Sequence, residues 1–137
     1  MGAGYEISCK KCGATAGVSE GNGMRFAQTF ENLFLNYMDE GERVSFARQI
    51  SDESVKDIDK CTFSKEALRC EKCLAITSRL VWSITFRDGW TFSPPLRCKS
   101  CRCDLKRFPF PGEGDFKAQC WECDSDTLSV ELSYMWD

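Results

Sequence analysis

Eight of the ten cysteines in this 137-residue sequence occur in four C-x-x-C pairs. The two residues between paired cysteines allow a tight turn that directs both thiolates at one metal ion, and two such turns complete a tetrahedron of four sulfurs. Four pairs therefore predict two Zn²⁺ sites. We refer to the pairs as knuckles 1 to 4, which are Cys9/Cys12, Cys70/Cys73, Cys98/Cys101 and Cys120/Cys123.

The spacing between knuckles favours one assignment of ligands to ions. The 18 residues between knuckles 3 and 4 match the hairpin of a zinc ribbon, which leaves knuckles 1 and 2 for the other ion. The first predicted site is Cys9, Cys12, Cys70 and Cys73. The second predicted site is Cys98, Cys101, Cys120 and Cys123. A cross-braced assignment, in which knuckle 1 shares an ion with knuckle 3, stays open as the alternative.

Cys61 and Cys103 lie outside the four pairs. Cys61 suits a buried apolar position, whereas Cys103 follows a predicted ligand by two residues and could replace it. A structural role is favoured over a redox role for both, because the chain has no histidine to activate either thiol.

The residue types present argue against catalysis. Without histidine, the commonest general base and the commonest ligand of open zinc sites are both missing. Sites with four sulfur ligands are closed and leave no position for water. We therefore expect no enzymatic activity and no small-molecule substrate.

Paired knuckles also resemble those of rubredoxins, which hold iron. Only Cys12 is followed by glycine here, whereas leucine, arginine and aspartate follow Cys73, Cys101 and Cys123. A rubredoxin-like electron carrier is therefore the less favoured alternative.

An even number of cysteines would also suit a secreted disulfide framework. Residues 1–13 contain no apolar stretch of the kind found in signal peptides, and no run of about 18 apolar residues occurs in the chain. We expect a reduced, cytoplasmic protein with no membrane segment.

Hydrophobic periodicity predicts strands next to the knuckles. Apolar residues alternate with polar ones over 5–9, 74–86 and 128–136, which is typical of strands, and 106–112 suits a hairpin between knuckles 3 and 4. A glycine-rich loop is expected over 17–23.

Helices are predicted between knuckles 1 and 2. Apolar residues recur at helical spacing from Met24, and Gly41 suits the C-cap of this helix. Two shorter helical segments are expected over 44–50 and 51–58. We expect the apolar stripe of the first helix to pack against the ribbons. The residues of that stripe are Phe26, Phe30, Leu33, Phe34 and Tyr37.

Together these elements predict an α+β fold. It would contain two four-cysteine zinc ribbons, each a small antiparallel sheet, with a helical insert between the first and second knuckles. Residues 1–92 would form the N-terminal ribbon with its insert at about 24–60, and residues 93–137 the C-terminal ribbon.

The formal net charge of −3 becomes −7 when each site carries four thiolates and one Zn²⁺, which disfavours nonspecific binding of nucleic acid. Basic residues nevertheless gather around knuckle 3, with aromatic residues nearby, and such a surface could hold phosphates and stack bases. Nucleic-acid binding is therefore the main alternative to a protein-interaction role. The candidate contacts are Arg97, Lys99, Arg102, Lys106, Arg107, Phe108 and Trp121.

The start Met-Gly-Ala-Gly-Tyr-Glu, the four knuckles around a helical insert, and the end in Trp136-Asp137 resemble small uncharacterised bacterial double zinc-ribbon proteins. The resemblance implies Zn²⁺ at the eight paired cysteines and a bacterial, cytoplasmic setting, and it implies no activity. We therefore expect a non-catalytic zinc-binding module that acts as an adaptor or regulatory protein-interaction protein, with a protein partner.

Overall fold

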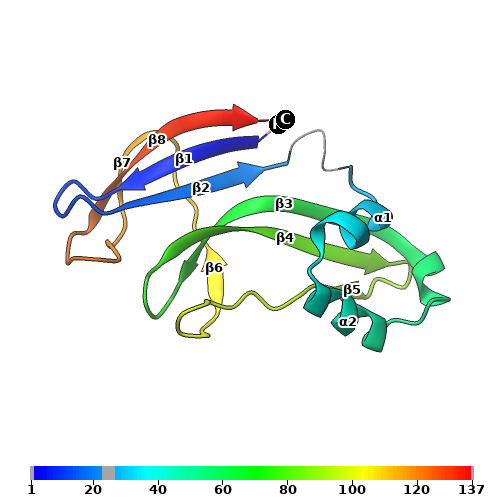
Figure 1. Cartoon of the computed structure of the whole chain (residues 1–137). Helices are drawn as coiled ribbons and strands as arrows, with labels where there is room; N and C mark the ends of the chain where they lie inside the picture. The colour runs from blue at the N-terminus through cyan, green and yellow to red at the C-terminus, as the bar shows by residue number, and fades with distance from the viewer. Residues whose placement is uncertain (1, 23–26, 137) are drawn as a thin grey trace. The chain divides into compact units, whose positions relative to one another are not determined.

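Strands predominate in the computed structural model, which describes residues 2–22 and 27–136 (Figure 1). The strands are β1 Gly2–Ser8, β2 Thr15–Gly21, β3 Ile58–Cys70, β4 Ile76–Phe86, β5 Thr91–Phe92, β6 Leu105–Arg107, β7 Gly114–Lys117 and β8 Thr127–Trp136. The helical segments are the α-helices α1 Phe30–Asn32 and α2 Glu40–Gln49, the π-helix η1 Leu33–Tyr37 and the 3-10 helix η2 Ser54–Asp57.

The strands pair as one series in the order β5-β4-β3-β2-β1-β8-β7, and β6 pairs with β3. The predicted fold of two small ribbon sheets separated by a helical insert is therefore wrong. The insert contributes the first part of the long strand β3 as well as helices. Sequence reasoning missed this strand because polar and charged residues, Ser64 to Glu66, interrupt its apolar alternation.

The chain divides into two compact units, each built from separate stretches of sequence. Unit 1 contains Met1–Gly23, Lys65–Arg79 and Pro95–Asp137, and unit 2 contains Met24–Ser64 and Leu80–Pro94. Strands β3 and β4 contribute residues to both units. These units do not coincide with the predicted ranges 1–92 and 93–137.

Unit 2 has an aromatic core between its helices and its strands. Leu33 from η1 and Phe46 from α2 are buried with Trp82 and Ile84 from β4. The rings of Phe46 and Phe92 meet edge to face, with centroids 5.6 Å apart. The described residues of the predicted apolar stripe thus belong to this core or pack against it, within their own unit: Phe30, Leu33, Phe34 and Tyr37.

The boundary between the first two helical segments of unit 2 lies at Asp39, whereas the sequence predicted a first helix that ends at Gly41 and a second segment that begins at Val44. The carboxylate of Asp39 accepts a hydrogen bond from the backbone N–H of Glu42 at 2.7 Å, and the Glu42 side chain accepts one from the N–H of Asp39 at 3.1 Å. This capping box begins α2, so Gly41 lies inside a helix and is not a C-cap. Met24 and Phe26, where the predicted helix starts, lie outside the described residues.

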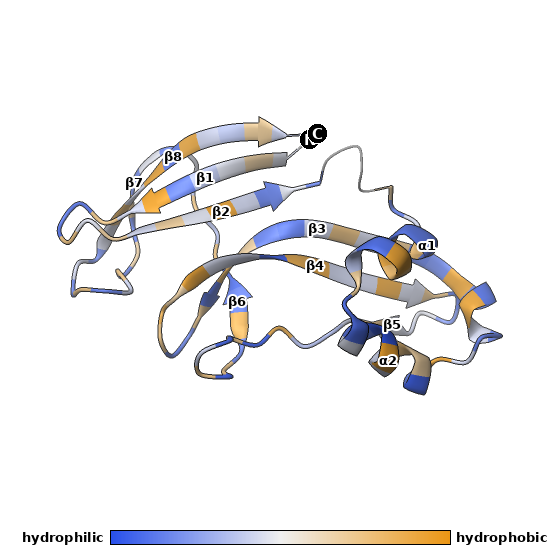
Figure 2. Ribbon diagram, in the orientation of Figure 1, coloured by the Kyte–Doolittle hydropathy of each residue, from blue (hydrophilic) through white to orange (hydrophobic). Residues whose placement is uncertain are grey.

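Unit 1 packs around side chains from β1 and β8 and from segments next to the knuckles. Ile7 and Val130 lie opposite each other on these strands and are buried with Phe108. Cys9 and Cys120 belong to the same buried cluster. Figure 2 shows apolar residues interspersed with polar ones along β1 and β8, as expected for strands with one buried face.

Two glycines on β1 allow aromatic rings from β8 to lie across the sheet. A Cβ atom at Gly4 would fall 2.2 Å from the ring of Tyr134, and one at Gly2 would fall 2.2 Å from the ring of Trp136. The Tyr134 hydroxyl lies 3.1 Å from the Ser19 hydroxyl on β2, so this ring spans β1. The close approach of strand and ring therefore requires glycine on β1.

Apolar alternation predicted three strands correctly, because 5–9, 74–86 and 128–136 correspond closely to β1, β4 and β8. The predicted loop over 17–23 is wrong. Its residues up to Gly21 belong to β2, which is held by pairing with β1 despite its glycines. Gly23 lies outside the described residues.

Candidate metal centres

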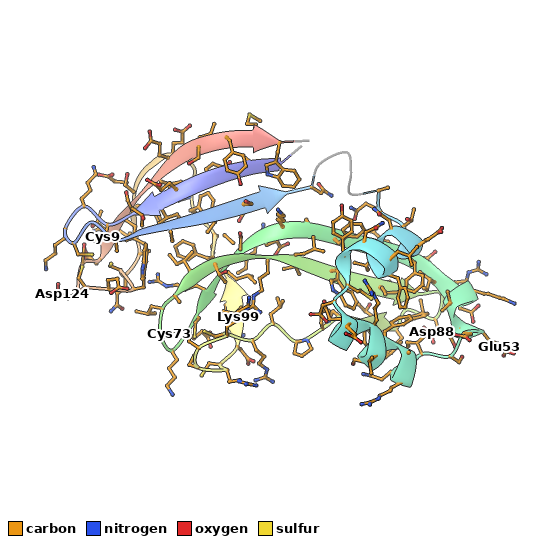
Figure 3. All side chains as sticks on the ribbon, viewed as in Figure 1. Cys9, Glu53, Cys73, Asp88, Lys99 and Asp124 are labelled. Atoms are coloured by element: carbon orange, nitrogen blue, oxygen red, sulfur yellow. The ribbon has the colours of Figure 1, made fainter. Side chains whose placement is uncertain are left out.

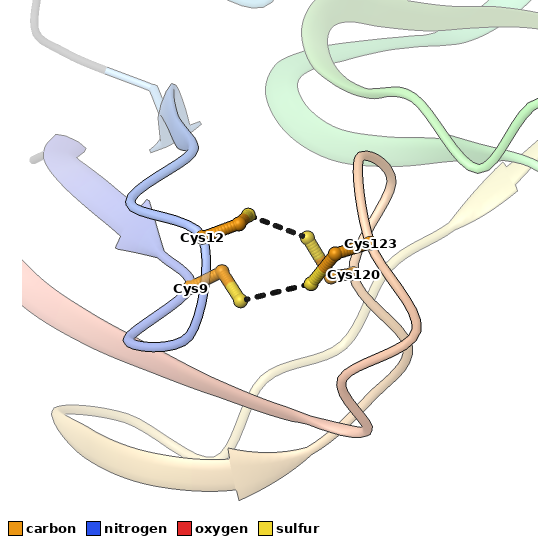
Figure 4. A group of neighbouring side chains, drawn as sticks. All are labelled: Cys9, Cys12, Cys120 and Cys123. Atoms are coloured by element: carbon orange, nitrogen blue, oxygen red, sulfur yellow. Dashed lines mark hydrogen bonds between the residues drawn. The ribbon is translucent and has the colours of Figure 1, made fainter.

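The eight paired cysteines form two groups of four, each close enough together to bind one metal ion. In both groups all four sulfur atoms lie within 4.8 Å of one another, and both groups belong to unit 1. Site A is Cys9, Cys12, Cys120 and Cys123 (Figure 4). Site B is Cys70, Cys73, Cys98 and Cys101.

The distances between sulfurs fit tetrahedral metal sites. A tetrahedron with Zn–S bonds of about 2.3 Å has sulfur–sulfur edges of about 3.8 Å, whereas a disulfide bond is about 2.0 Å long. The Sγ–Sγ distances between cysteines of facing knuckles are 3.6 Å for Cys9–Cys123, 3.6 Å for Cys12–Cys120, 3.7 Å for Cys73–Cys98 and 3.1 Å for Cys70–Cys101. All ten cysteines are free. Each group can therefore place four thiolates around one ion.

Strand pairing explains which knuckles meet. Strand β1 ends just before knuckle 1 and β8 begins after knuckle 4, and their antiparallel register pairs Ser8 with Ser129. The two knuckles therefore lie at the same end of neighbouring strands. At site B, β3 ends at knuckle 2 and β6 begins after knuckle 3, and Cys70 pairs with Leu105. At both sites, therefore, two paired antiparallel strands place their knuckles at the same end.

The predicted assignment of knuckles to ions is wrong, and the cross-braced alternative is wrong as well. Knuckle 1 meets knuckle 4 and knuckle 2 meets knuckle 3, so site B is nested inside site A along the sequence. The predicted hairpin over 106–112 does not form, because β6 pairs with β3 and β7 pairs with β8. Pro109 and Pro111 lie in this segment, and proline has no N–H to donate to a strand ladder. All eight predicted ligands nevertheless belong to the two sites.

The knuckles share a backbone pattern. In each one the N–H of the first cysteine donates to the carbonyl five residues further on. These carbonyls are those of Ala14, Ala75, Cys103 and Ser125, at 2.8 to 3.0 Å. In knuckles 1 to 3 the residue before that carbonyl has positive φ, and it is Gly13, Leu74 or Arg102. Leucine and arginine therefore adopt the turn that glycine adopts in knuckle 1, at a cost of about 1 kcal/mol each. The absence of glycine after Cys73 and Cys101 therefore does not prevent these knuckles from forming the same turn as knuckle 1.

Backbone N–H groups also point at the first sulfur of a knuckle. The N–H of Cys73 lies 3.5 Å from the sulfur of Cys70. Hydrogen bonds from Cys12 N–H and from Cys73 N–H are the largest causes that lower the pKa of Cys9 and of Cys70, each to about 6. The thiolate form, which is the form that binds metals, is thus favoured at these two positions near neutral pH.

Two ion pairs join knuckle 1 to neighbouring segments of site A, one to strand β7 and one to the residue that follows knuckle 4. Lys10 Nζ lies 3.0 Å from the carboxylate of Asp115, and Lys11 pairs with Asp124. Hydrogen bonds from these lysines lower the pKa of both aspartates. Because all four side chains are largely exposed and screened by solvent, these pairs add little stability.

Arg69 connects the two sites through the backbone. Its Nε donates to the carbonyl of Leu74 at 3.0 Å, beside knuckle 2, and a second guanidinium N–H donates to the carbonyl of Gln119, next to Cys120. The guanidinium carbon lies 5.3 Å from the ring centroid of Phe108. Burial lowers the pKa of Arg69. Sequence reasoning missed this residue because no motif marks it.

The two unpaired cysteines have different surroundings. Cys61 lies in the core of unit 2, so its predicted buried position is confirmed, and burial raises the pKa of its thiol to about 11. Cys103 belongs to neither group of four. Its carbonyl accepts a hydrogen bond from the N–H of Cys98 at 2.8 Å, and its thiol is hydrogen bonded to that of Cys101.

The predicted nucleic-acid contacts separate into exposed charges and buried rings. Phe108 lies in the core of unit 1, and Trp121 packs partly buried against the same core. Arg97 pairs with Asp104 at 3.1 Å. Lys99 is exposed, and Figure 3 labels it near Cys73 of site B. The other exposed basic residues of the predicted set are Arg102, Lys106 and Arg107.

Comparisons of the chain with protein-family models, with curated proteins and with solved structures found no match. In the part of the chain that the structure describes, no helix is both long and apolar enough to cross a membrane.

Proposed function

We propose that this chain is a non-catalytic zinc-binding module that acts by binding other molecules, as an adaptor or regulatory interaction protein. The observation that carries the proposal is the pair of all-sulfur sites, A and B. Four thiolates around one ion complete its coordination, which leaves no position for water or substrate. The metals then act by holding the knuckles together.

Zinc is the metal that we propose for both sites. Soft thiolate ligands favour zinc or iron–sulfur chemistry over magnesium or calcium, and structural zinc sites are typically tetrahedral with four cysteines. A rubredoxin-like iron site uses the same ligands, so an electron carrier is the outcome that the metal analysis has to exclude.

Native mass spectrometry of protein purified without added metal tests the proposal. We expect two zinc ions and ten free thiols after denaturation in chelator. Iron in the purified protein would favour the electron carrier, and disulfides without metal would overturn the proposal. Substitution by Co²⁺ should give a tetrathiolate spectrum that does not respond to added small anions, whereas a response would indicate an open, catalytic site.

Because knuckle 1 shares an ion with knuckle 4 and knuckle 2 with knuckle 3, zinc content in cysteine variants also tests which knuckles share an ion. The double variant Cys12→Ser/Cys123→Ser alters site A alone and should retain one zinc ion. Cys12→Ser/Cys73→Ser alters one ligand of each site and should weaken both ions. Sequential pairing would give the opposite pattern for the two double variants. Cys103→Ser, next to site B but outside both groups, should keep two ions and serves as the control.

A further inference from the structure

The surfaces around the two sites differ in charge. Knuckles 1 and 4 with strand β7 and the turn before it carry more acidic than basic residues. The acidic residues are Glu113, Asp115, Glu122, Asp124 and Asp126, and the basic ones are Lys10, Lys11 and Lys117. Knuckles 2 and 3 with their flanks and strand β6 carry the exposed residues Lys72, Arg97, Lys99, Arg102, Lys106 and Arg107 against Glu71 and Asp104.

The basic residues of the two sites also differ in pairing. At site A all three lysines have an aspartate partner, and the last of these pairs joins Lys117 to Asp126 at 3.4 Å. At site B, Arg97 pairs with Asp104. Within residues 2–22 and 27–136, the other five basic side chains there have no hydrogen bond or ion pair. We call these five the site B cations, and they are Lys72, Lys99, Arg102, Lys106 and Arg107.

We propose that the site B cations bind the phosphate backbone of a single-stranded nucleic acid. This inference rests on the proposed function, because the metal at site B fixes knuckles 2 and 3 beside each other. Unpaired cations on a rigid surface can each neutralise a phosphate and release its counterions. The overall negative charge does not oppose this, because most of the acidic residues lie around site A and in unit 2, and only Glu71 and Asp104 lie next to the site B cations in the sequence.

The structure favours recognition of the backbone over recognition of bases. Base recognition on single strands uses exposed aromatic rings as stacking platforms. Phe108 is 7% exposed and lies under the guanidinium of Arg69, so it cannot stack on a base. Trp121 belongs to knuckle 4 of site A and packs, partly buried, against the core of unit 1. Binding should therefore depend little on sequence.

An anionic membrane is a weaker candidate for this surface. Peripheral membrane binding combines basic residues with an apolar face that enters the lipid. Among the described residues of unit 1, the exposed large apolar side chains are Leu132, Tyr134 and Met135 on β8, and none comes from knuckles 2 and 3 or β6. Knuckles 2 and 3 carry cations but no exposed large apolar side chain, so their surface suits a hydrated polyanion better than a lipid bilayer.

Fluorescence anisotropy with labelled oligo-dT and oligo-U of about 20 nucleotides tests the proposal. Five phosphate contacts on a single strand predict a slope of log K against log salt of about −3.5, and thus about a hundredfold weaker binding at 200 mM than at 50 mM salt. The triple variant Lys99→Gln/Lys106→Gln/Arg107→Gln should bind at least tenfold more weakly at low salt, with a slope of about −1.4.

A matched triple variant at site A provides the control. Lys10→Gln/Lys11→Gln/Lys117→Gln removes the same number of positive charges. Its affinity for the oligonucleotides should stay within about twofold of the wild-type affinity, a much smaller loss than that of the site B variant. Equal losses in both variants would show general charge attraction and would overturn the proposal. Zinc content is measured in every variant, so two zinc ions without binding would refute this partner and leave the proposed function intact.

Parallel measurements decide among polyanions. Vesicles of phosphatidylcholine with phosphatidylserine and a polyglutamate peptide are titrated under the same conditions. Tighter binding of either one than of the oligonucleotides, with the same dependence on the site B cations, would assign the surface to a lipid headgroup or an acidic protein and overturn the nucleic-acid proposal.

Discussion

Units 1 and 2 achieve stability in different ways. Unit 2 buries a continuous aromatic cluster in which Phe46 contacts the rings of Phe30 and Phe92, and Cys61 is its only cysteine. Unit 1 contains all eight paired cysteines, and its buried cluster includes Cys9 and Cys120 themselves. Where ligand residues occupy core positions, the metal has to supply stability that side-chain packing supplies elsewhere.

From this comparison we expect the metal ions to stabilise mainly the fold of unit 1. Strands β3 and β4 contribute to both units, with Cys61 and Phe63 in one core and Ala67 in the other. Loss of metal should therefore affect the ends of these strands near knuckle 2 more than the ends in unit 2. The predictions below test how far the two units respond separately.

Removal of metal should have the largest effect. Structural zinc contributes about 10 kcal/mol to folding at each site, so chelation should unfold β1, β8 and the knuckles. Hydrogen exchange measured by mass spectrometry should show loss of protection in residues 2–22 and 105–136, with more protection left over 80–92. Simultaneous loss of protection in both units would show that unit 2 cannot fold without unit 1.

Truncation of the unit 2 core should give the converse result. Phe46→Ala removes a buried ring that contacts three others and should lower the free energy of unfolding by about 3 to 5 kcal/mol. Denaturation monitored by tryptophan fluorescence measures this loss, while the zinc content should stay at two ions. Val44→Ala on the exposed face of α2 is the control and should change stability by about 0.5 kcal/mol or less. Loss of zinc from Phe46→Ala would contradict separate units.

Arg69 should couple the two metal sites within unit 1. Arg69→Met keeps an apolar stem but leaves the carbonyls of Leu74 and Gln119 without this donor, at a cost of about 1 to 3 kcal/mol. Both zinc ions should then transfer faster to a chromogenic chelator. Arg97→Met, which breaks an exposed ion pair beside site B, should change the rates little. Faster release of zinc from site B alone would show that Arg69 does not couple the two sites.

The ligand set could be predicted from the sequence because it depends on local geometry. A C-x-x-C turn directs two thiolates at one ion wherever it lies, so Cys9/Cys12 and the other pairs are recognisable without the fold. The alternation that predicted β4 and β8 is local in the same sense. The pairing of knuckles depends instead on the registers of β1 with β8 and of β3 with β6, which join residues more than 30 positions apart.

Two of the remaining errors also come from tertiary context, and one comes from a local signal. Thr15–Gly21 has weak strand propensity, yet pairing along the whole of β1 makes it a strand. Asp39 could end one helix or begin the next, and the reciprocal bonds with Glu42 decide for the second. Arg69 acquires its role only because β3 ends beside both knuckle 2 and Gln119. The pairing of β2 and the contacts of Arg69 cannot be read from a sequence window, whereas Asp39-x-x-Glu42 is a capping-box pattern that the sequence does contain.

Cys61 provides the smallest predicted effect, and it tests unit 2 through pH. Burial raises its pKa from 9.0 to about 11 in the folded protein, so the neutral thiol is favoured when folded. This contribution to stability is fully present below pH 9 and decreases as the pH rises toward 11, because the unfolded thiol ionises first. Chemical denaturation of the wild type and of Cys61→Ala at pH 8 and 10 should show a smaller decrease for the variant. In the native protein at pH 8 Cys61 should also react slowly with thiol reagents, as its 6% exposure predicts, and rapid labelling would mean that the aromatic core opens readily.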